Sequence, residues 1–174
     1  MIFETKRLYV TRWQPRDLKA LHELYNDPAI KEFILPALTL EETRHIFEDQ
    51  LNLYRTHFPF GRYFIVEKIS NKFIGLLLFK KDNKKAGVEI GYSLIKNQWH
   101  KGYATEIVKE GITWIFKQDR FLSISAITEL HNENSKNVLL KCGFLPQQTF
   151  IEHGEEMNLF GLLKKGRTTI EYTT

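Results

Sequence analysis

One short segment of the chain combines a lone glycine, a lysine and the start of the most regular helical pattern in the sequence. It runs from Trp99 to Thr105, between a strand predicted to end near Ile95 and a helix predicted to begin near Tyr103. A helix N-terminus exposes N–H groups without intrahelical partners and carries roughly half a positive charge. A glycine there lets a ligand approach the backbone, so the junction suits a phosphate. Because Gly102 stands alone, the segment is neither a Walker loop nor a dinucleotide fingerprint, and an ordinary turn is the competing interpretation.

Two other features carry groups that could take part in acid–base chemistry. The polar segment from His131 to Phe144 follows a strand predicted over 121–129 and enters a helix predicted near 134–142. Glu89 lies in another predicted strand, three positions before Tyr92. A carboxylate in this place can serve as a general base or form a surface ion pair, and Tyr92 can line a substrate channel or pack in the core.

Taken in order along the chain, these motifs resemble the GCN5-related N-acetyltransferases, the GNAT family. The resemblance is closer to the Rim-type branch, which includes ribosomal-protein N-terminal acetyltransferases. It also rests on the opening run from Glu4 to Leu8 and on a closing strand from Met157 to Leu163. It implies a single acetyl-CoA-dependent N-acetyltransferase domain over residues 1–174. The implied fold class is mixed α/β (α+β), with a mostly antiparallel central sheet of six to seven strands flanked by helices.

The resemblance implies acetyl-CoA as the co-substrate and assigns its contacts. The pyrophosphate would lie on the main chain of the loop, where Gly102 and Ala104 fit the family pattern and Trp99 stands in place of the usual Arg or Gln. The pantetheine arm would lie beside the strand that contains Tyr92. The implied cofactor-binding residues are Ser93, Leu94, His100, Lys101, Gly102, Tyr103, Ala104, Thr105, Asn132, Asn134 and Asn137.

Acetyl transfer to an amine needs a neutral nucleophile. An α-amine with a pKa of about 7.7–8.0 is roughly a tenth neutral at pH 7, whereas a lysine amine near 10.4 is neutral in well under a thousandth. Glu89 is the predicted base and Tyr92 the predicted substrate-channel residue. Many relatives carry a tyrosine acid at the position of Leu139, so Ser135 is the predicted substitute; its alternative role is to cap the helix N-terminus.

The acceptor stays open at this point. It could be the N-terminal amine of a ribosomal or other protein, or a small amine such as a polyamine, an antibiotic or another metabolite. A non-catalytic acyl-CoA-binding module is the alternative from another class, since the usual tyrosine is missing.

The composition suits these expectations and excludes other classes. Lys+Arg 25 against Asp+Glu 21 gives a net charge of +4 over 174 residues, which fits an anionic cofactor but is too small to indicate nucleic-acid binding. The charged start of the chain does not fit a signal peptide, and the apolar run from Phe73 to Phe79 is far shorter than the roughly 20 residues of a membrane span. A cytoplasmic protein without membrane or nucleic-acid partners is expected, and the resemblance admits a homodimer. The single cysteine, Cys142, is predicted to be a structural thiol, and no metal-ligand spacing occurs.

Periodicity predicts the elements that must position these residues. A strand is predicted over 6–13, and helices follow Pro15 and, briefly, Asp27-Pro28. A capping box at Thr39 and Glu42 predicts a helix over 40–56. Strands are then predicted over 62–68, 73–79 and 88–95, a helix from about Tyr103 to Phe116, and the strand over 121–129 and helix near 134–142. A final hairpin of strands is predicted near 144–151 and 156–164.

Overall fold

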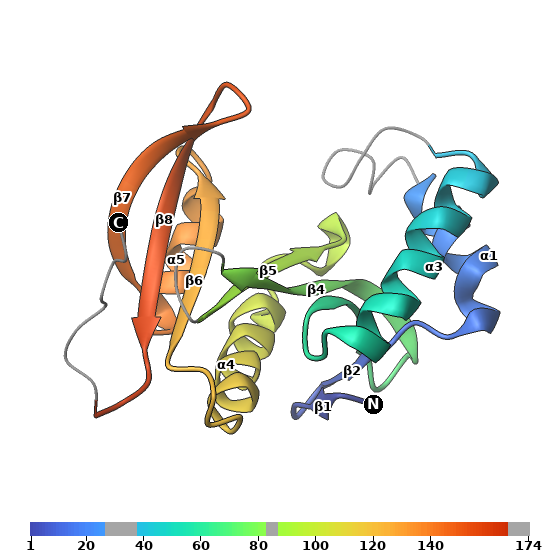
Figure 1. Cartoon of the computed structure of the whole chain (residues 1–174), viewed down its shortest axis with the longest axis horizontal. Helices are drawn as coiled ribbons and strands as arrows, with labels where there is room; N and C mark the ends of the chain where they lie inside the picture. The colour runs from blue at the N-terminus through green and yellow to red at the C-terminus, as the bar shows by residue number, and fades with distance from the viewer. Residues whose placement is uncertain (27–37, 83–86, 167–174) are drawn as a thin grey trace. The chain divides into compact units, whose positions relative to one another are not determined.

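The computed structural model describes residues 1–26, 38–82 and 87–166 (Figure 1). The elements are β1 (Phe3–Glu4), β2 (Leu8–Thr11), α1 (Leu18–Tyr25), α3 (Leu40–Thr56), β3 (Gly61–Glu67), β4 (Lys72–Asp82), β5 (Gly87–Leu94), α4 (Tyr103–Phe116), β6 (Ser123–Glu129), α5 (Glu133–Lys141), β7 (Leu145–Glu152) and β8 (Glu155–Leu163), with 3₁₀ turns at Pro15–Asp17 and Lys96–Gln98. The short helix predicted after Asp27-Pro28 lies outside the described residues.

The strands that the structure describes form one eight-stranded sheet in the order β1-β2-β3-β4-β5-β6-β8-β7. Strand β5 pairs with β6 in parallel, whereas β1–β2, β2–β3, β6–β8 and β7–β8 are antiparallel. The mixed α/β class and the mostly antiparallel sheet were therefore predicted correctly. The predicted six to seven strands fell short by one, because β1 has two residues, too few for alternation to reveal.

The chain divides into two compact units, and strands β4 and β5 contribute residues to both. The first unit holds Met1–Leu78 and Ser93–Lys101. In it, α1 packs against α3 and α3 against β3. Its core includes Trp13, whose ring stacks on Phe47 at 5.9 Å and on Phe64 at 5.4 Å between centroids. The capping box predicted for α3 is confirmed, because Thr39 and Glu42 bond each other's main-chain N–H groups.

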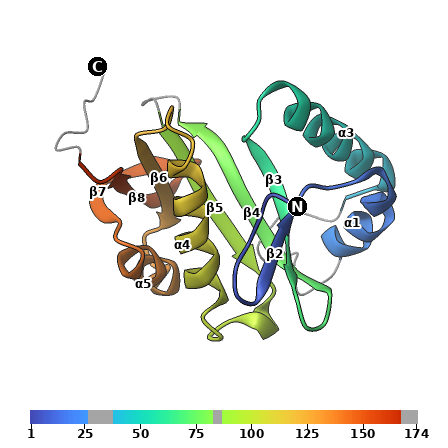
Figure 2. The same ribbon diagram turned by 90° about the horizontal axis from the view of Figure 1, so that it is seen from below.

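The second unit holds Phe79–Tyr92 and the chain from Gly102 onward. Helix α4 buries the face formed by Ile107, Val108 and Ile115, as its periodicity predicts. Gly111 belongs to the same face, and a Cβ built on it would lie 3.1 Å from Cδ1 of Ile90, so a glycine here allows close packing on β5. Helices α4 and α5 also contact each other (Figure 2).

Strands β5 and β6 share only the start of their length. Their register pairs Val88 with Ile124 and Glu89 with Ser125. Strand β6 then continues to Glu129, paired along its whole length with β8. Figure 1 shows β5 and β6 running apart beyond the paired positions. Glu89 is therefore the last residue of β5 in that register, at the point where the two strands separate.

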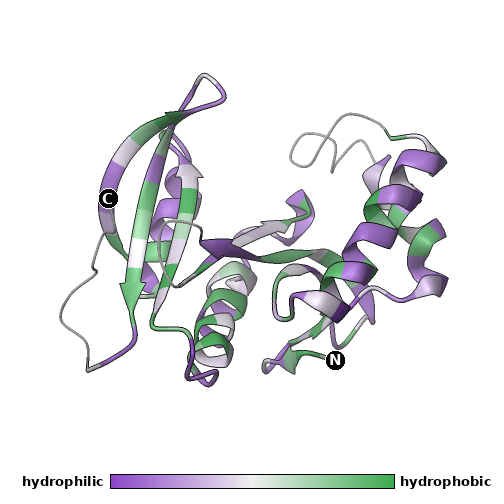
Figure 3. Cartoon of the chain, viewed as in Figure 1, coloured by the Kyte–Doolittle hydropathy of each residue, from purple (hydrophilic) through white to green (hydrophobic). Residues whose placement is uncertain are grey.

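The hydropathy of the ribbon follows this architecture. Figure 3 shows apolar residues along β8 and hydrophilic residues at the turn between β7 and β8. None of the helices in the described part of the chain is long and apolar enough to cross a membrane.

Candidate active site

The start of α4 is the first part of the candidate site. Its N-cap is Gly102, which has a left-handed φ of 79°, and no side chain caps this end. His100, two residues earlier, also has a positive φ of 58°. The first hydrogen bond of the helix runs from the N–H of Glu106 to the carbonyl of Gly102. Because the first N–H groups of a helix lack intrahelical acceptors, this end fits an anionic group, and the main chain around Gly102 resembles the concave anion-binding turns of proteins.

Three side chains hold the loop that leads into α4, all within the first unit. The indole N–H of Trp99 donates to the carbonyl of Leu94 at 2.8 Å, which gives the family-atypical tryptophan a structural use. The ammonium of Lys101 donates to Gln98 at 2.9 Å. The guanidinium of Arg7 donates to the carbonyl of Lys101 at 2.9 Å. The loop conformation is thus fixed by protein contacts.

Glu89 has the environment of a tuned carboxylate. Its side chain is 19% exposed and its Oε2 lies 3.7 Å from Nζ of Lys80. Burial raises the pKa of Glu89, Lys80 opposes that rise, and the nearby carboxylates of Asp82 and Glu152 add to it. The ion-pair interpretation of Glu89 is therefore confirmed, and its role as a general base stays a prediction that the raised pKa suits.

Tyr92 and Ser135 are brought together. The hydroxyl of Tyr92 lies 3.1 Å from Oγ of Ser135, so strand β5 and helix α5 share a hydroxyl pair. Burial raises the pKa of Tyr92, although the hydrogen bond to Ser135 lowers it somewhat. The phenol therefore keeps its proton at neutral pH and can donate to Ser135.

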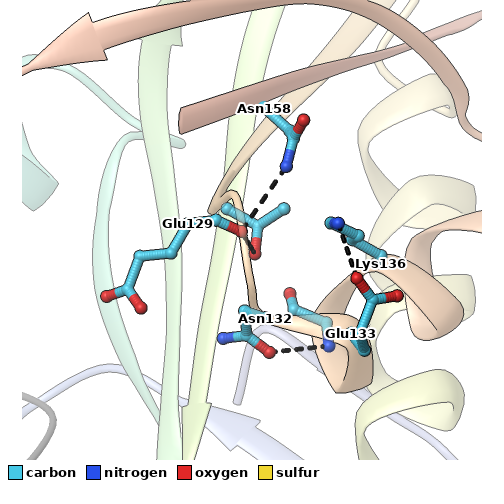
Figure 4. A network of polar contacts seen from close by, with 7 residues as sticks. Glu129, Asn132, Glu133, Lys136 and Asn158 are labelled. Carbon is cyan, nitrogen blue, oxygen red and sulfur yellow. Dashed lines mark hydrogen bonds and ion pairs between the residues drawn. The ribbon is translucent and has the colours of Figure 1, made fainter. Parts of the chain in front are cut away.

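The start of α5 differs from the start of α4. Its N-cap is Asn132, whose Oδ1 accepts from the N–H of Ser135 at 3.0 Å (Figure 4). The interpretation of Ser135 as the N-cap is therefore wrong, because Ser135 is the third helical residue and uses its main chain, leaving its side chain to Tyr92. Lys136 pairs with Glu133 at 2.7 Å in the same turn.

The remaining predicted residues divide between inner and outer positions. Leu139, at the usual tyrosine position, is buried, and it lies one helical turn after Ser135 on the same side of α5. Cys142 is half-buried with Sγ 3.8 Å from the carbonyl of Thr105. Burial raises the pKa of Cys142, which fits the structural role predicted for it. Asn134 and Asn137 are exposed.

The C-terminal end of β5 holds two more of the predicted cofactor-binding residues. Ser93 is partly buried and Leu94 is buried.

Glu89 and Tyr92 lie three positions apart on β5. Because side chains alternate along a strand, the two side chains project to opposite faces of β5. The base and the hydroxyl pair would therefore act from opposite sides.

Two residues of this region escaped prediction. Lys80 directly follows the strand predicted over 73–79 and pairs with Glu89 of the next predicted strand. The sequence does not reveal this partner, because it does not fix the register of the two strands. Arg7 meets Lys101 across 94 positions, and no local pattern reveals such a contact. Among the described residues, no group of three or more His, Cys, Asp or Glu side chains is placed to hold a metal ion.

Comparison with known proteins identifies the family of this chain. The family model for an acetyltransferase (GNAT) domain matches residues 7–145. An uncharacterized N-acetyltransferase p20 from Bacillus licheniformis is 25% identical over 170 residues, which are 92% of this chain and 95% of that protein.

Solved structures share the fold. A ribosomal-protein alanine acetyltransferase from Vibrio fischeri has a TM-score of 0.78 at 20% identity, covering 96% of this chain and 98% of its own. RimL, a ribosomal α-N-protein acetyltransferase in complex with coenzyme A, has a TM-score of 0.77 at 17% identity, covering 93% and 97%. The family match covers most of the chain, and together these findings show that the chain belongs to the GNAT family and is an acetyl-CoA-dependent N-acetyltransferase.

Proposed function

We propose that the protein transfers the acetyl group of acetyl-CoA directly to a primary amine, with no covalent enzyme intermediate. The observation that carries the proposal is the position of Glu89, a mostly buried carboxylate at the last register position that β5 shares with β6. At that point the ladder between β5 and β6 ends, so main-chain groups of β5 beyond it are not paired with β6 in that register. Residues 1–174 would form one such domain.

The residues present suit the co-substrate. The main chain from Lys101 to Thr105 would hold the pyrophosphate, with His100 beside it, because this helix end has no side-chain cap and a left-handed glycine at its start. Ser93, Leu94 and Asn132 would border the pantetheine arm, and Tyr92 the reacting end. The amide nitrogen of Asn132 points away from the capping contact, which leaves it as a donor (Figure 4). Asn134 and Asn137, both exposed, would contribute only at the edge of the site.

When bound, acetyl-CoA supplies an acetyl thioester. Glu89 would take the proton that the amine loses as its nitrogen bonds to the acetyl carbon. The bond between that carbon and sulfur breaks, and Ser135 would donate a proton to the departing thiolate, replenished through the hydroxyl of Tyr92. Nitrogen joins the acetyl carbon as sulfur leaves it, so the base and the acid would act on different atoms.

The proposed acceptor is an α-amine, such as the N-terminus of a ribosomal or other protein. A pKa of about 7.7–8.0 leaves enough neutral amine for a carboxylate base to serve. The motifs of the Rim-type branch support this choice, and two proteins of the same fold are ribosomal-protein acetyltransferases. The cytoplasmic location and the homodimer stay predictions. Light scattering, which measures the molar mass in solution, would test the homodimer.

A thiol-release assay tests the proposal. The purified protein and acetyl-CoA are mixed with a lysine-containing peptide bearing a free N-terminus, with the same peptide acetylated at its N-terminus, and with spermidine. Thiol release with the first peptide alone, and mass-spectrometric placement of the acetyl group on the α-amine, is the expected result. Release with spermidine alone would point to a small-amine acceptor, and binding of acetyl-CoA without release in any arm would point to a non-catalytic acyl-CoA-binding module.

A further inference from the structure

We infer that Arg7 is a positioning residue for the phosphate-binding loop, an inference that rests on the proposed pyrophosphate site. Its guanidinium donates to the main-chain carbonyl of Lys101 at 2.9 Å, although the two residues are 94 positions apart. Both belong to the first compact unit. The contact joins the segment before β2 to the residue that immediately precedes Gly102.

The main chain of Arg7 is itself fixed on both sides. Its N–H donates to Oγ1 of Thr5 at 3.3 Å, and the N–H of Leu8 donates to the same oxygen at 2.9 Å. Its carbonyl accepts from the N–H of Lys68 at 2.9 Å. The N–H of Thr5 closes the turn on the carbonyl of Leu8 at 2.9 Å. The main chain of Arg7 is therefore held in place, which limits the positions that its guanidinium can reach.

The peptide bond between Lys101 and Gly102 explains why the hydrogen bond from Arg7 affects the proposed phosphate site. In a planar trans peptide the C=O and the following N–H point in opposite directions. A donor that holds the Lys101 carbonyl therefore also fixes the direction of the Gly102 N–H, one of the groups proposed to face the pyrophosphate. The flanking residues His100 and Gly102 both have positive φ values, 58° and 79°. Left-handed backbone is unfavourable for His100, which is not a glycine, so contacts that support the loop offset this cost.

Charge alone does not account for the contact. A lysine carries the same charge, but its ammonium ends one bond earlier than the Nη atoms of arginine and lacks the planar fork. Arg12 offers a matched control: it is an exposed arginine on the same N-terminal segment, and its guanidinium lies over the rings of Tyr54 and Phe58 at 5.4 and 4.7 Å instead of on the loop.

The experiment compares the wild type with Arg7→Gln, Arg7→Lys and Arg12→Gln. Calorimetry measures the Kd for coenzyme A, and steady-state assays measure kcat/KM for acetyl-CoA and for S-acetylpantetheine, which lacks the pyrophosphate. For Arg7→Gln we expect a Kd about tenfold weaker and an equal loss in kcat/KM for acetyl-CoA. We expect kcat at saturation, and kcat/KM for S-acetylpantetheine, to stay within about twofold of wild type. Arg7→Lys should stay at least fivefold weaker, and Arg12→Gln should bind like the wild type.

Three outcomes would overturn the inference. Equal losses on both thioesters would mean that Arg7 merely supports the fold. Full recovery in Arg7→Lys, or an equal loss in Arg12→Gln, would mean that positive charge alone is at work. A wild type that binds coenzyme A no better than pantetheine is a different result, since it removes the proposed pyrophosphate site and the inference with it.

Discussion

The two helices that begin in the second unit, α4 and α5, start in opposite ways. Helix α4 begins at a left-handed glycine, Gly102, and no side chain caps it. Helix α5 begins at Asn132, whose side chain accepts from the N–H of Ser135. Both helices follow a strand through a loop, so their sequence contexts are similar. The groups that each helix N-terminus exposes are different.

Under the proposed function, this difference separates cofactor binding from catalysis within the second unit. The α4 end would offer main-chain N–H groups to the cofactor, so its proposed function depends on backbone conformation and hardly on side-chain identity. The α5 end satisfies one of its own N–H groups, so what it can offer is side chains, above all Ser135 with its partner Tyr92. Cofactor binding at the α4 end should therefore be sensitive to changes in backbone φ. The reaction rate should be sensitive to single-atom changes in the side chains at the α5 end.

The largest expected effect comes from breaking the backbone at α4. Gly102→Val puts a β-branched residue at a φ of 79°, which misdirects the first N–H groups of the helix. Loss of two charge-assisted hydrogen bonds at about 2 kcal/mol each weakens the Kd for coenzyme A about a thousandfold. Isothermal titration calorimetry measures the Kd.

The matched control is Gly154→Val, at a turn glycine with a φ of 86° and no atom within 4 Å of an added Cβ. Both substitutions should cost about 1–2 kcal/mol of folding free energy through the same strain. Normal coenzyme A binding by Gly102→Val would show that the open end of α4 is not the phosphate site.

The next largest effect belongs to a side chain. Glu89→Gln keeps the shape of the residue but removes the proton acceptor, so kcat should fall about a hundredfold or more, within the usual range for a general base. Binding of coenzyme A should not change, because the contacts proposed for the phosphates are main-chain N–H groups of the 101–105 loop. Thiol release and calorimetry on the same preparation separate the two quantities, and an unchanged kcat would exclude Glu89 as the base.

The pH dependence sharpens the same assignment. A base works only when deprotonated, and burial raises the pKa of Glu89, so kcat/KM should rise with pH through that raised value. Lys80 lowers the pKa of Glu89, so Lys80→Met should move the acidic limb of the profile to higher pH. Lys81→Met, which changes the neighbouring lysine, is the control. If the acidic limb stayed in place or moved to lower pH in Lys80→Met, the titration of Glu89 would not control kcat/KM.

A smaller effect should follow from the hydroxyl pair at α5. Ser135→Ala leaves the main-chain cap intact and removes the proposed acid, so kcat should fall about 10- to 30-fold with little change in Tm. Tyr92→Phe should give a similar loss, and the double variant should lose no more than either single one, because the two hydroxyls act as one unit. Lys141→Ala, at an exposed position of α5 that has no proposed role, is the control. Independent, multiplying losses would contradict the paired role.

The two helix ends also show what sequence can predict. The pattern of α4, with Gly102 before a strict apolar stripe, was enough to place the helix start at Tyr103 and to predict an anion site there, because the signal is local. The same holds for the α3 capping box. For α5 the helix was predicted one residue late, since Asn132 caps with a side chain that sequence alone cannot distinguish from Asn134 or Ser135.

Contacts between distant segments were beyond prediction. The hydroxyl of Tyr92 meets Ser135, which lies 43 positions later in the chain. This contact depends on how α5 packs in the second unit, and no local pattern reveals that packing. The ion pair between Lys80 and Glu89 depends on strand register, which a turn of uncertain length leaves undetermined. Glu89 and Ser135 were predicted without these partners, which set the surroundings of the two side chains.

The smallest expected effect tests the cap itself. Asn132→Ala removes the acceptor for the Ser135 N–H, which should cost about 1 kcal/mol of unfolding free energy and lower Tm by about 2–4 °C in a chain of this size. Asn132→Asp should recover the stability, because a carboxylate accepts the same bond and also suits the positive end of the helix. If α5 uses its side chains for catalysis, the cap serves by holding Ser135 in place, so kcat should fall a few-fold in Asn132→Ala and recover together with Tm in Asn132→Asp. A kcat that stays low while Tm recovers would instead assign Asn132 a direct contact with the pantetheine arm, and α5 would then bind as well as catalyse.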